Sequence, residues 1–308
     1  MPHISVIIPF YNCVNWLEEA VESALLQSFN DYEIILVDDG SETADNFPPN
    51  INDNRVRYVR QENSGPAAAR NLGVKLSTGQ FVAFLDSDDL WLPNKLEVQL
   101  GYMLDNPDII FSHTSYIRIN TKGTFIEEIA SGKFRGKVYP RIISNCPIAT
   151  PTVMIRRDIL NEFKFNEFAK IGEDVILWTQ ISKQYEILGI NKPLTKVRIH
   201  NNNAAFNIHR NLQGNLNIIN HALEYDRGLD IFSKRKAYSK LYNIKGSIFL
   251  QKNLRNKGIR CFIKGLFSWP VSINNFLMLF QCILPERYFL YFAEISRKIN
   301  SLRSSKLL

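Results

Sequence analysis

The stretch FVAFLDSDD at residues 81–89 joins a run of five apolar residues to three carboxylates within the next four positions. An apolar run of this length is typical of a buried strand in a parallel sheet. The acids then lie at the carboxyl end of the strand, where open α/β sheets bind their ligands. Carboxylates clustered at such an edge suit Mg²⁺ or Mn²⁺, which proteins hold with one or two carboxylates and substrate phosphate oxygens. The alternative is that the acids only cap a following helix, although one residue suffices for a cap.

The strand at 81–85 belongs to an alternating series of apolar runs and helical patterns. Such alternation predicts a parallel α/β sheet. In chain order the series has strands at 4–8, 34–37, 55–59 and 81–85, with helices at about 14–28 and 66–76 between them.

The pattern changes after about residue 108, where shorter apolar runs are separated by polar loops that contain glycine and proline. These runs predict the completion of a mixed sheet, with one more helix near 173–184. They lie at 108–112, 115–119, 152–155, 186–190 and 194–199. Beyond about residue 205 the strand patterns fade and helical patterns remain. We therefore predict an α/β domain over residues 1–205 and a helical region over residues 206–308.

The charge is divided between these two parts. Residues 231–308 carry 15 Lys and Arg against two acidic residues, whereas the chain as a whole has a net charge of +7. The basic residues of this tail are mixed with many aromatic ones, a combination that suits attachment to an anionic membrane surface. A solvated helix face is the plainer alternative. Nucleic-acid binding is disfavoured, because no known binding motif accompanies the charge.

The composition also indicates the cellular compartment in which the protein is expected. The four cysteines are far apart and form no metal-binding spacing, so we expect reduced thiols in a reducing compartment. The amino terminus has no basic region ahead of its apolar run, so we expect no signal peptide. No window of 18 apolar residues occurs, which argues against a spanning helix. These features predict a cytoplasmic protein, peripheral at the inner face of the cell membrane.

Polar residues follow several of the predicted strands. Asp38 and Asp39 come directly after the second strand and share the sheet edge with the acids after residue 85, although acid pairs are also common in turns. Glu173 and Asp174 precede an apolar pattern of helical spacing, where acids can simply complement the positive end of a helix. His200 follows the last strand, a place where a histidine is more often a loop residue than a ligand.

Five motifs in a fixed order carry a resemblance to a known family. They are SVIIPFYN at 5–12, VDDGS at 37–41, ARN at 69–71, LDSDD at 85–89 and GED at 172–174. Together they resemble the family-2 inverting glycosyltransferases with the GT-A nucleotide-sugar fold, over about residues 3–205. The resemblance implies a Rossmann-like mixed sheet flanked by helices, followed here by the C-terminal helical region.

The resemblance also implies roles for individual residues. On the donor side, Asp39 would accept a hydrogen bond from a uracil or similar base, and Arg70 would lie beside the base or diphosphate. Asp86 would lie near the ribose, and Asp88 would bind the Mn²⁺ or Mg²⁺ that bridges the diphosphate, with His200 touching the metal or diphosphate and Asp89 able to share the metal. The nucleotide-binding set is Pro9, Tyr11, Asp39, Arg70, Asp86 and Ser87.

Asp174 matches the catalytic base of the family. A carboxylate within reach of the acceptor hydroxyl can take its proton, and a divalent ion can neutralise the leaving phosphate, so a single displacement would invert the anomeric centre. We expect a hexosyltransferase-type enzyme that acts in bacterial surface polysaccharide biosynthesis. It would move a sugar from a nucleotide donor, which we expect to be a UDP-sugar. The acceptor would be a hydroxyl of a saccharide linked to polyprenyl diphosphate. The alternatives are transfer to polyprenyl phosphate, which needs no general base, nucleotidyl transfer, and a non-catalytic membrane-associated nucleotide-binding protein.

Overall fold

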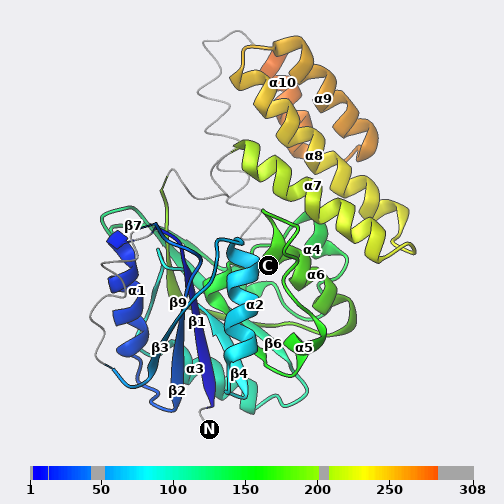
Figure 1. Ribbon diagram of the computed structural model, residues 1–308. Helices are drawn as coiled ribbons and strands as arrows, with labels where there is room; N and C mark the ends of the chain where they lie inside the picture. The colour runs from blue at the N-terminus through cyan, green and yellow to red at the C-terminus, as the bar shows by residue number, and fades with distance from the viewer. Residues whose placement is uncertain (1–2, 13, 43–52, 201–207, 284–308) are drawn as a thin grey trace. The chain divides into compact units, whose positions relative to one another are not determined.

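The computed structural model describes residues 3–12, 14–42, 53–200 and 208–283. The chain divides into two compact units, residues 1–139 with 146–201 and residues 140–145 with 202–308. The first unit is a sheet with helices on both faces, and the second is helical (Figure 1). The segment 140–145, which includes the short helix α4 (Arg141–Ser144), groups with the second unit, an assignment that the sequence did not predict.

One half of the sheet is parallel, as the sequence predicted. The strands β3, β2, β1 and β4 lie side by side in that order and all pair in parallel. Their inward side chains are almost entirely Ile, Val, Leu and Phe, so burial of apolar surface stabilises this half. The bounds are β1 (Ile4–Phe10), β2 (Tyr32–Asp38), β3 (Val56–Arg60) and β4 (Phe81–Phe84).

The other half of the sheet is mixed and contains longer strands than expected. The sequence predicted two short strands at 108–119 and two at 186–199, but each pair is one strand, β6 (Phe111–Ile119) and β9 (Leu188–Arg198). The predicted breaks are shifts of register around Ser115, which pairs with Pro193, and proline hides the continuity of the strand in the sequence. The remaining strands are β5 (Leu90–Trp91), β7 (Phe125–Ile129) and β8 (Val153–Arg156).

The order β4-β8-β6-β9-β5 completes the main sheet, and β7 pairs with β6 as an exposed hairpin strand that the sequence did not predict. The pairs β4–β8, β8–β6 and β9–β5 are antiparallel, and β6–β9 is parallel. The mixed sheet expected from the sequence is therefore confirmed over the described residues.

Helices cover both faces of this sheet. On one face α1 (Val14–Leu25) and α3 (Lys95–Leu104) share an apolar core with β1, β2 and β4. On the other face lie α2 (Pro66–Leu76) and α6 (Glu173–Gln184), both with the bounds that the sequence predicted. The α6 residue Trp178 is fully buried and packs edge-on against Phe111, so it belongs to the core on this face. Short helices are α5 (Ile159–Glu162), η2 (Ser131–Lys133) and η3 (Thr150–Thr152).

In the part of the chain that the structure describes, the second unit contains α4 and four longer helices. These are α7 (Ile208–Tyr225), α8 (Ile231–Gln251), α9 (Arg255–Ser268) and α10 (Ile273–Ile283), in agreement with the helical patterns of the sequence. Glycines let α8 and α9 approach closely, because a Cβ at Gly246 would lie 2.4 Å from the ring of Phe262. Among the described residues, no helix is both long enough and apolar enough to cross a membrane.

Candidate active site

Three strand ends bring the predicted donor residues to one edge of the sheet. Phe10 at the end of β1 pairs with Asp38 at the end of β2, and β4 ends on the other side of β1. Pro9 is buried within β1, whereas Tyr11 is exposed just beyond the strand, so its ring is accessible to a ligand. The loops after all three strands therefore open at the same edge, as the sequence predicted for a parallel sheet.

The two acids after β2 are buried and have different partners. Asp38 accepts hydrogen bonds from the Tyr58 hydroxyl and the Ser41 amide, each at 2.8 Å, and thereby shapes its own loop. Asp39 accepts bonds from the Gln61 side chain and from the backbone amides at positions 64 and 65. A carboxylate has about four acceptor positions. Three are used here, so one remains for the base contact predicted for Asp39, which stays a prediction.

Arg70 joins two parts of the site that are far apart in the sequence. This buried guanidinium donates from Nη2 to Asp86 at 2.7 Å and from Nη1 to Glu173 at 2.9 Å. Burial alone would lower the pKa of Arg70, but the carboxylates of Asp86 and Glu173 raise it above its ordinary value. The cation therefore ties the acid cluster after β4 to the first turn of α6.

The acids after β4 occupy different environments. Asp86, Ser87 and Asp88 are half-buried and open to the edge, but Asp89 is fully buried and accepts the backbone N–H of Arg198 at 2.7 Å. Burial, followed by the charges of Asp88 and Asp86, raises the pKa of Asp89 well above its ordinary value. Asp89 therefore fixes the end of β9 through one of its two oxygens, and its sharing of a metal with Asp88 stays a prediction.

His200 lies beside Asp88, with Nε2 2.7 Å from Oδ2. Burial and then the charge of Asp86 raise the pKa of Asp88, while the hydrogen bond from His200 opposes the rise. The imidazole is positioned from the other side by the indole of Trp16, whose ring centroid is 4.8 Å away. The histidine predicted from the sequence as a ligand thus meets the acid predicted as its partner.

The Asp88–His200 pair fits a divalent cation of the Mn²⁺ or Mg²⁺ class. A carboxylate oxygen and an imidazole nitrogen 2.7 Å apart can serve one ion that takes its other ligands from phosphate and water. The described residues contain no group of three or more His, Cys, Asp or Glu side chains that could hold a metal alone. A cation at this place would therefore take its other ligands from the donor phosphates and water.

Asp174 lies in the first turn of α6, next to Glu173. One oxygen, Oδ2, accepts the hydroxyl of Thr150 at 2.9 Å, and the other accepts the Val175 amide at 2.7 Å. The carboxylate is only half-buried, so it can reach a ligand. Thr150 is the first residue of η3, so this short helix positions one oxygen of Asp174. The base role predicted for Asp174 stays a prediction.

Several residues with a part in this arrangement were missed by the sequence reasoning. Glu173 pairs with Arg70, Thr150 orients Asp174, and Trp16 supports His200. Buried Arg198 pairs with Glu19 at 2.7 Å and donates from Nε to the backbone oxygen of Asp88. Only Glu173 carried a signal in the sequence, as the middle residue of the motif at 172–174.

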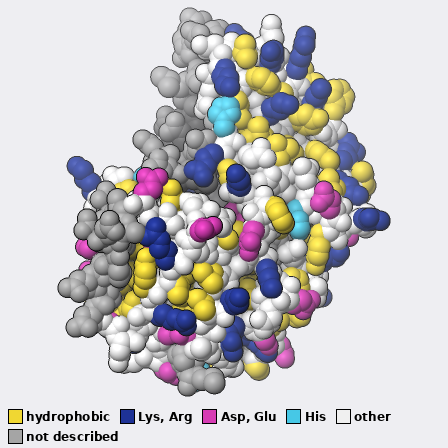
Figure 2. All heavy atoms as spheres, in the orientation of Figure 1, with side chains coloured by type: hydrophobic (Ala, Val, Ile, Leu, Met, Phe, Trp, Pro, Cys, Tyr) yellow, Lys and Arg dark blue, Asp and Glu magenta, His cyan; other side chains and the backbone are white. Residues whose placement is uncertain are grey.

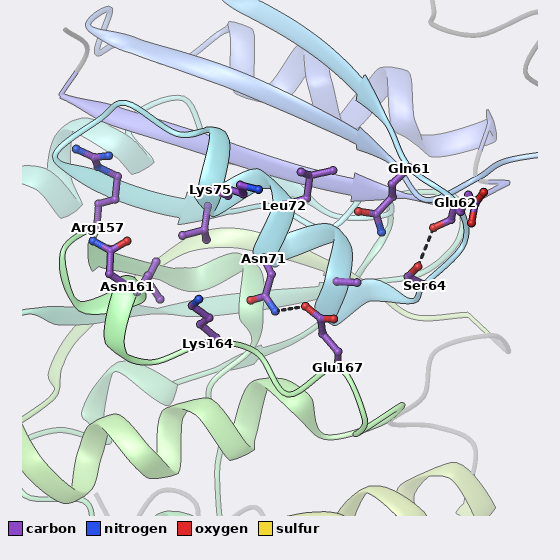
Figure 3. Close-up of a pocket in the computed structure, with 13 residues that line it drawn as sticks. Gln61, Glu62, Ser64, Asn71, Leu72, Lys75, Arg157, Asn161, Lys164 and Glu167 are labelled. Carbon is purple, nitrogen blue, oxygen red and sulfur yellow. Dashed lines mark hydrogen bonds between the residues drawn. The ribbon is translucent and has the colours of Figure 1, made fainter.

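A groove of about 720 Å³ runs along α2, outside the acid cluster (Figure 3). Asn71 lies in its wall and binds the segment that leads to α6, accepting the Phe165 amide and donating to the Phe165 carbonyl and Glu167. Arg70 and Asn71, adjacent in α2, thus hold the start of α6 and the loop before it. The charged residues lining the groove are Glu62, Lys75, Arg157, Lys164 and Glu167.

The chain is similar to proteins of known family. The model of glycosyl transferase family 2 matches residues 5–163, which include the ends of β1, β2 and β4. An uncharacterized glycosyltransferase of Rickettsia felis is 49% identical over 205 residues, or 66% of this chain and 34% of the relative. The chain therefore spans about a third of that relative's length. WfgD of Escherichia coli is 36% identical over 190 residues, or 61% of this chain and 73% of WfgD.

The fold is similar to that of TarS from S. aureus. TarS 1–349 superposes with a TM-score of 0.60 at 18% identity, covering 91% of this chain and 90% of that one. At this identity the likeness concerns the fold, a GT-A-like mixed sheet flanked by helices with a helical region after it. The family model, the sequence relatives and the shared fold agree, and the chain belongs to glycosyl transferase family 2.

Proposed function

We propose that this protein is a metal-dependent inverting glycosyltransferase that moves a sugar from a nucleotide donor to a hydroxyl of a saccharide. The observation that carries the proposal is the Arg70 bridge. It joins Asp86, beside the Asp88–His200 pair, to Glu173, whose neighbour is Asp174. A site for a phosphate-bound cation and a candidate general base are thereby held in one arrangement.

On the donor side, each residue has a task suited to its surroundings. Tyr11 and the remaining acceptor position of Asp39 would hold the base, and Asp86 and Ser87 would hold the ribose. Asp88 and His200 would hold Mn²⁺ or Mg²⁺, which would neutralise charge on the departing diphosphate. Buried Arg70 keeps its charge and orients Asp86 from behind.

On the acceptor side, Asp174 would take the proton of the attacking hydroxyl. The Thr150 hydroxyl and the Val175 amide fix its two oxygens, and lone pairs remain for the acceptor. Attack from the face opposite the leaving diphosphate forms the new glycosidic bond as the old one breaks, which inverts the anomeric carbon. A general base of this kind contributes roughly 10²–10⁴-fold to a rate.

The names of the relatives suggest the substrates. WfgD is a UDP-Glc:alpha-D-GlcNAc-diphosphoundecaprenol beta-1,3-glucosyltransferase, and TarS 1–349 is known in a complex with UDP. We extend these to a UDP-sugar donor and a saccharide acceptor linked to polyprenyl diphosphate, in bacterial surface polysaccharide biosynthesis. Such an acceptor would place the enzyme at the cytoplasmic face of the membrane.

The test is titration calorimetry of the protein with UDP and with GDP, each with and without Mn²⁺. We expect UDP binding that requires the metal and that Asp88→Ala abolishes. Asp105→Ala, which removes an exposed carboxylate at the end of α3, is the matched control and should bind UDP normally. Failure of a folded protein to bind either nucleotide in the presence of metal would contradict the proposal.

A further inference from the structure

The helices α8, α9 and α10 meet at one end of the second unit. Arg235, near the start of α8, donates to the carbonyls of Phe267 and Ser268 at the end of α9, each at 2.7 Å. Asn275, near the start of α10, donates to the Ser239 hydroxyl at 2.7 Å. These bonds fix the start of α8, the end of α9 and the start of α10 as one end of the bundle.

Large apolar side chains project from this end into solvent. Phe232 contacts the indole of Trp269 edge-on, with ring centroids 6.4 Å apart. Exposed apolar side chains that gather at one end of a bundle mark a candidate interaction surface. The exposed fractions are 61% for Ile231, 64% for Phe232, 77% for Phe267, 70% for Val271 and 57% for Phe276, and we call these five residues the apolar tip.

The surroundings of the apolar tip are basic. Residues 231–283 contain ten Lys and Arg and no Asp or Glu, and Lys236 and Lys264 are exposed near the apolar tip. Figure 2 shows Lys and Arg side chains interspersed with apolar ones over the helical unit. The nearest preceding acids, Asp226 and Asp230, both bind backbone amides, of Gly228 and Ser233.

We propose that the apolar tip inserts into the interface of an anionic lipid bilayer, with the surrounding lysines and arginines on the lipid headgroups. The proposal rests on the proposed function, because an enzyme with a lipid-linked acceptor works at a membrane surface. Aromatic and aliphatic side chains partition into the headgroup and acyl boundary, and nearby cations add attraction to anionic lipid. The rigid end of a bundle presents both together without any spanning helix.

The charges favour a bilayer over other occupants. A second copy of this surface would bring two all-basic segments together, and like charges repel. The phosphates of a nucleic acid would pair with the lysines and arginines, and its bases would stack on the aromatic rings. The aliphatic side chains of Ile231 and Val271 would make neither contact. Anionic lipid matches both the apolar side chains and the charge.

The experiment is flotation of the full chain with vesicles, in the absence of nucleotide and acceptor. We expect binding to vesicles of phosphatidylcholine mixed with phosphatidylglycerol, much weaker binding to phosphatidylcholine alone, and weakening by salt. Replacing both Phe232 and Phe267 with Ser should reduce partitioning at least about tenfold. Replacing both Lys236 and Lys264 with Ser should reduce it by about fivefold per charge.

Matched controls exist in the first unit. Phe125→Ser removes a phenylalanine of β7 that is also 64% exposed, and Lys122→Ser removes an exposed lysine of the adjoining turn. Neither should change vesicle binding. Equal binding by the tip variants and the wild type would overturn the proposal, as would tip variants that only shift a monomer–dimer equilibrium in sedimentation. Because UDP binding is measured separately, loss of one property does not imply loss of the other.

Discussion

The central strands β1 and β6 are both largely buried, yet they are stabilised in different ways. In β1, which lies in the parallel half of the sheet, the buried residues include Ile4, Val6, Ile7 and Ile8, with Ser5 as a buried hydroxyl. In β6, in the mixed half, they include Ser112, His113, Thr114 and Ser115, all inaccessible to solvent. Apolar burial stabilises the first strand, whereas the second depends on hydrogen bonds such as that from Gly132 to the Ser115 hydroxyl.

This difference extends to the site. The parallel half contributes polar groups at its strand ends, with Asp38 as the last residue of β2 and Asp86 and Asp88 in the loop after β4. The mixed half contributes Arg198 from within β9 and His200 just after it. The parallel half thus supplies the acids that we propose bind the donor. Elements around the mixed half contact those acids and supply the candidate base. The comparison implies that donor binding and chemistry can be lost separately.

The largest effect should come from Asp174→Asn. If the elements of the mixed half supply only the base, turnover should fall roughly 10²–10⁴-fold. UDP affinity should remain unchanged, because the donor acids are intact. Steady-state transfer and calorimetry with UDP measure the two quantities, and Glu167→Gln, in the loop before α6, is the control. Retained turnover would leave transfer to polyprenyl phosphate, which needs no general base, as the better assignment.

Arg70→Met breaks the bridge between the two halves. It leaves Asp86 and buried Glu173 without their cation, and removing one partner of a buried ion pair costs about 3–5 kcal/mol. Unfolding in urea measures the loss. The control is Arg156→Met, whose pair with Asp158 is exposed and should contribute less than about 1 kcal/mol. Equal losses of unfolding free energy in the two variants would show that the bridge contributes no more to stability than an exposed ion pair.

His113 makes the mixed half sensitive to acid. Burial lowers its pKa from 6.5 to about 4, although Nε2 donates to the carbonyl of Phe134. Between pH 6.5 and pH 4 the unfolded chain binds a proton at His113 and the folded chain does not. The free energy of unfolding is therefore highest, as far as His113 decides it, above pH 6.5, and it is about 3 kcal/mol lower at pH 4. Asp88, Asp89 and Glu173, whose pKa values are raised by burial first, act in the opposite direction. Their effect cancels when wild type is compared with a His113 variant.

The variant for that comparison is His113→Gln, which keeps a donor near the Phe134 carbonyl. We expect the difference in unfolding free energy between wild type and variant to change by about 3 kcal/mol between pH 6.5 and pH 4. Urea melts at several pH values measure it. Parallel pH curves for the two proteins would show that His113 does not titrate on unfolding in this range.

The sequence predicted the parallel half closely and the mixed half poorly, for physical reasons. Uniform apolar runs identify buried strands, so the place of Asp86 and Asp88 after β4, at the edge of the sheet, was predicted correctly. Their roles stay predictions. A buried polar strand such as β6 has no such pattern. The partners of Arg70 and Asp89 were hidden for another reason, because Glu173 and Arg198 lie more than 100 residues away. Only the fold brings such pairs together.

The smallest effect should come from Asp89→Asn, which tests whether Asp89 differs from its neighbour Asp88. Burial raises the pKa of Asp89 well above its usual value because it disfavours the charged form, and an amide imitates the neutral form. Its oxygen can still accept the Arg198 N–H, so stability should change by less than about 1 kcal/mol and metal-dependent UDP binding should persist. Asp89→Ala leaves that N–H without its acceptor and should cost about 1–3 kcal/mol. Loss of UDP binding in Asp89→Asn would instead make both acids metal ligands.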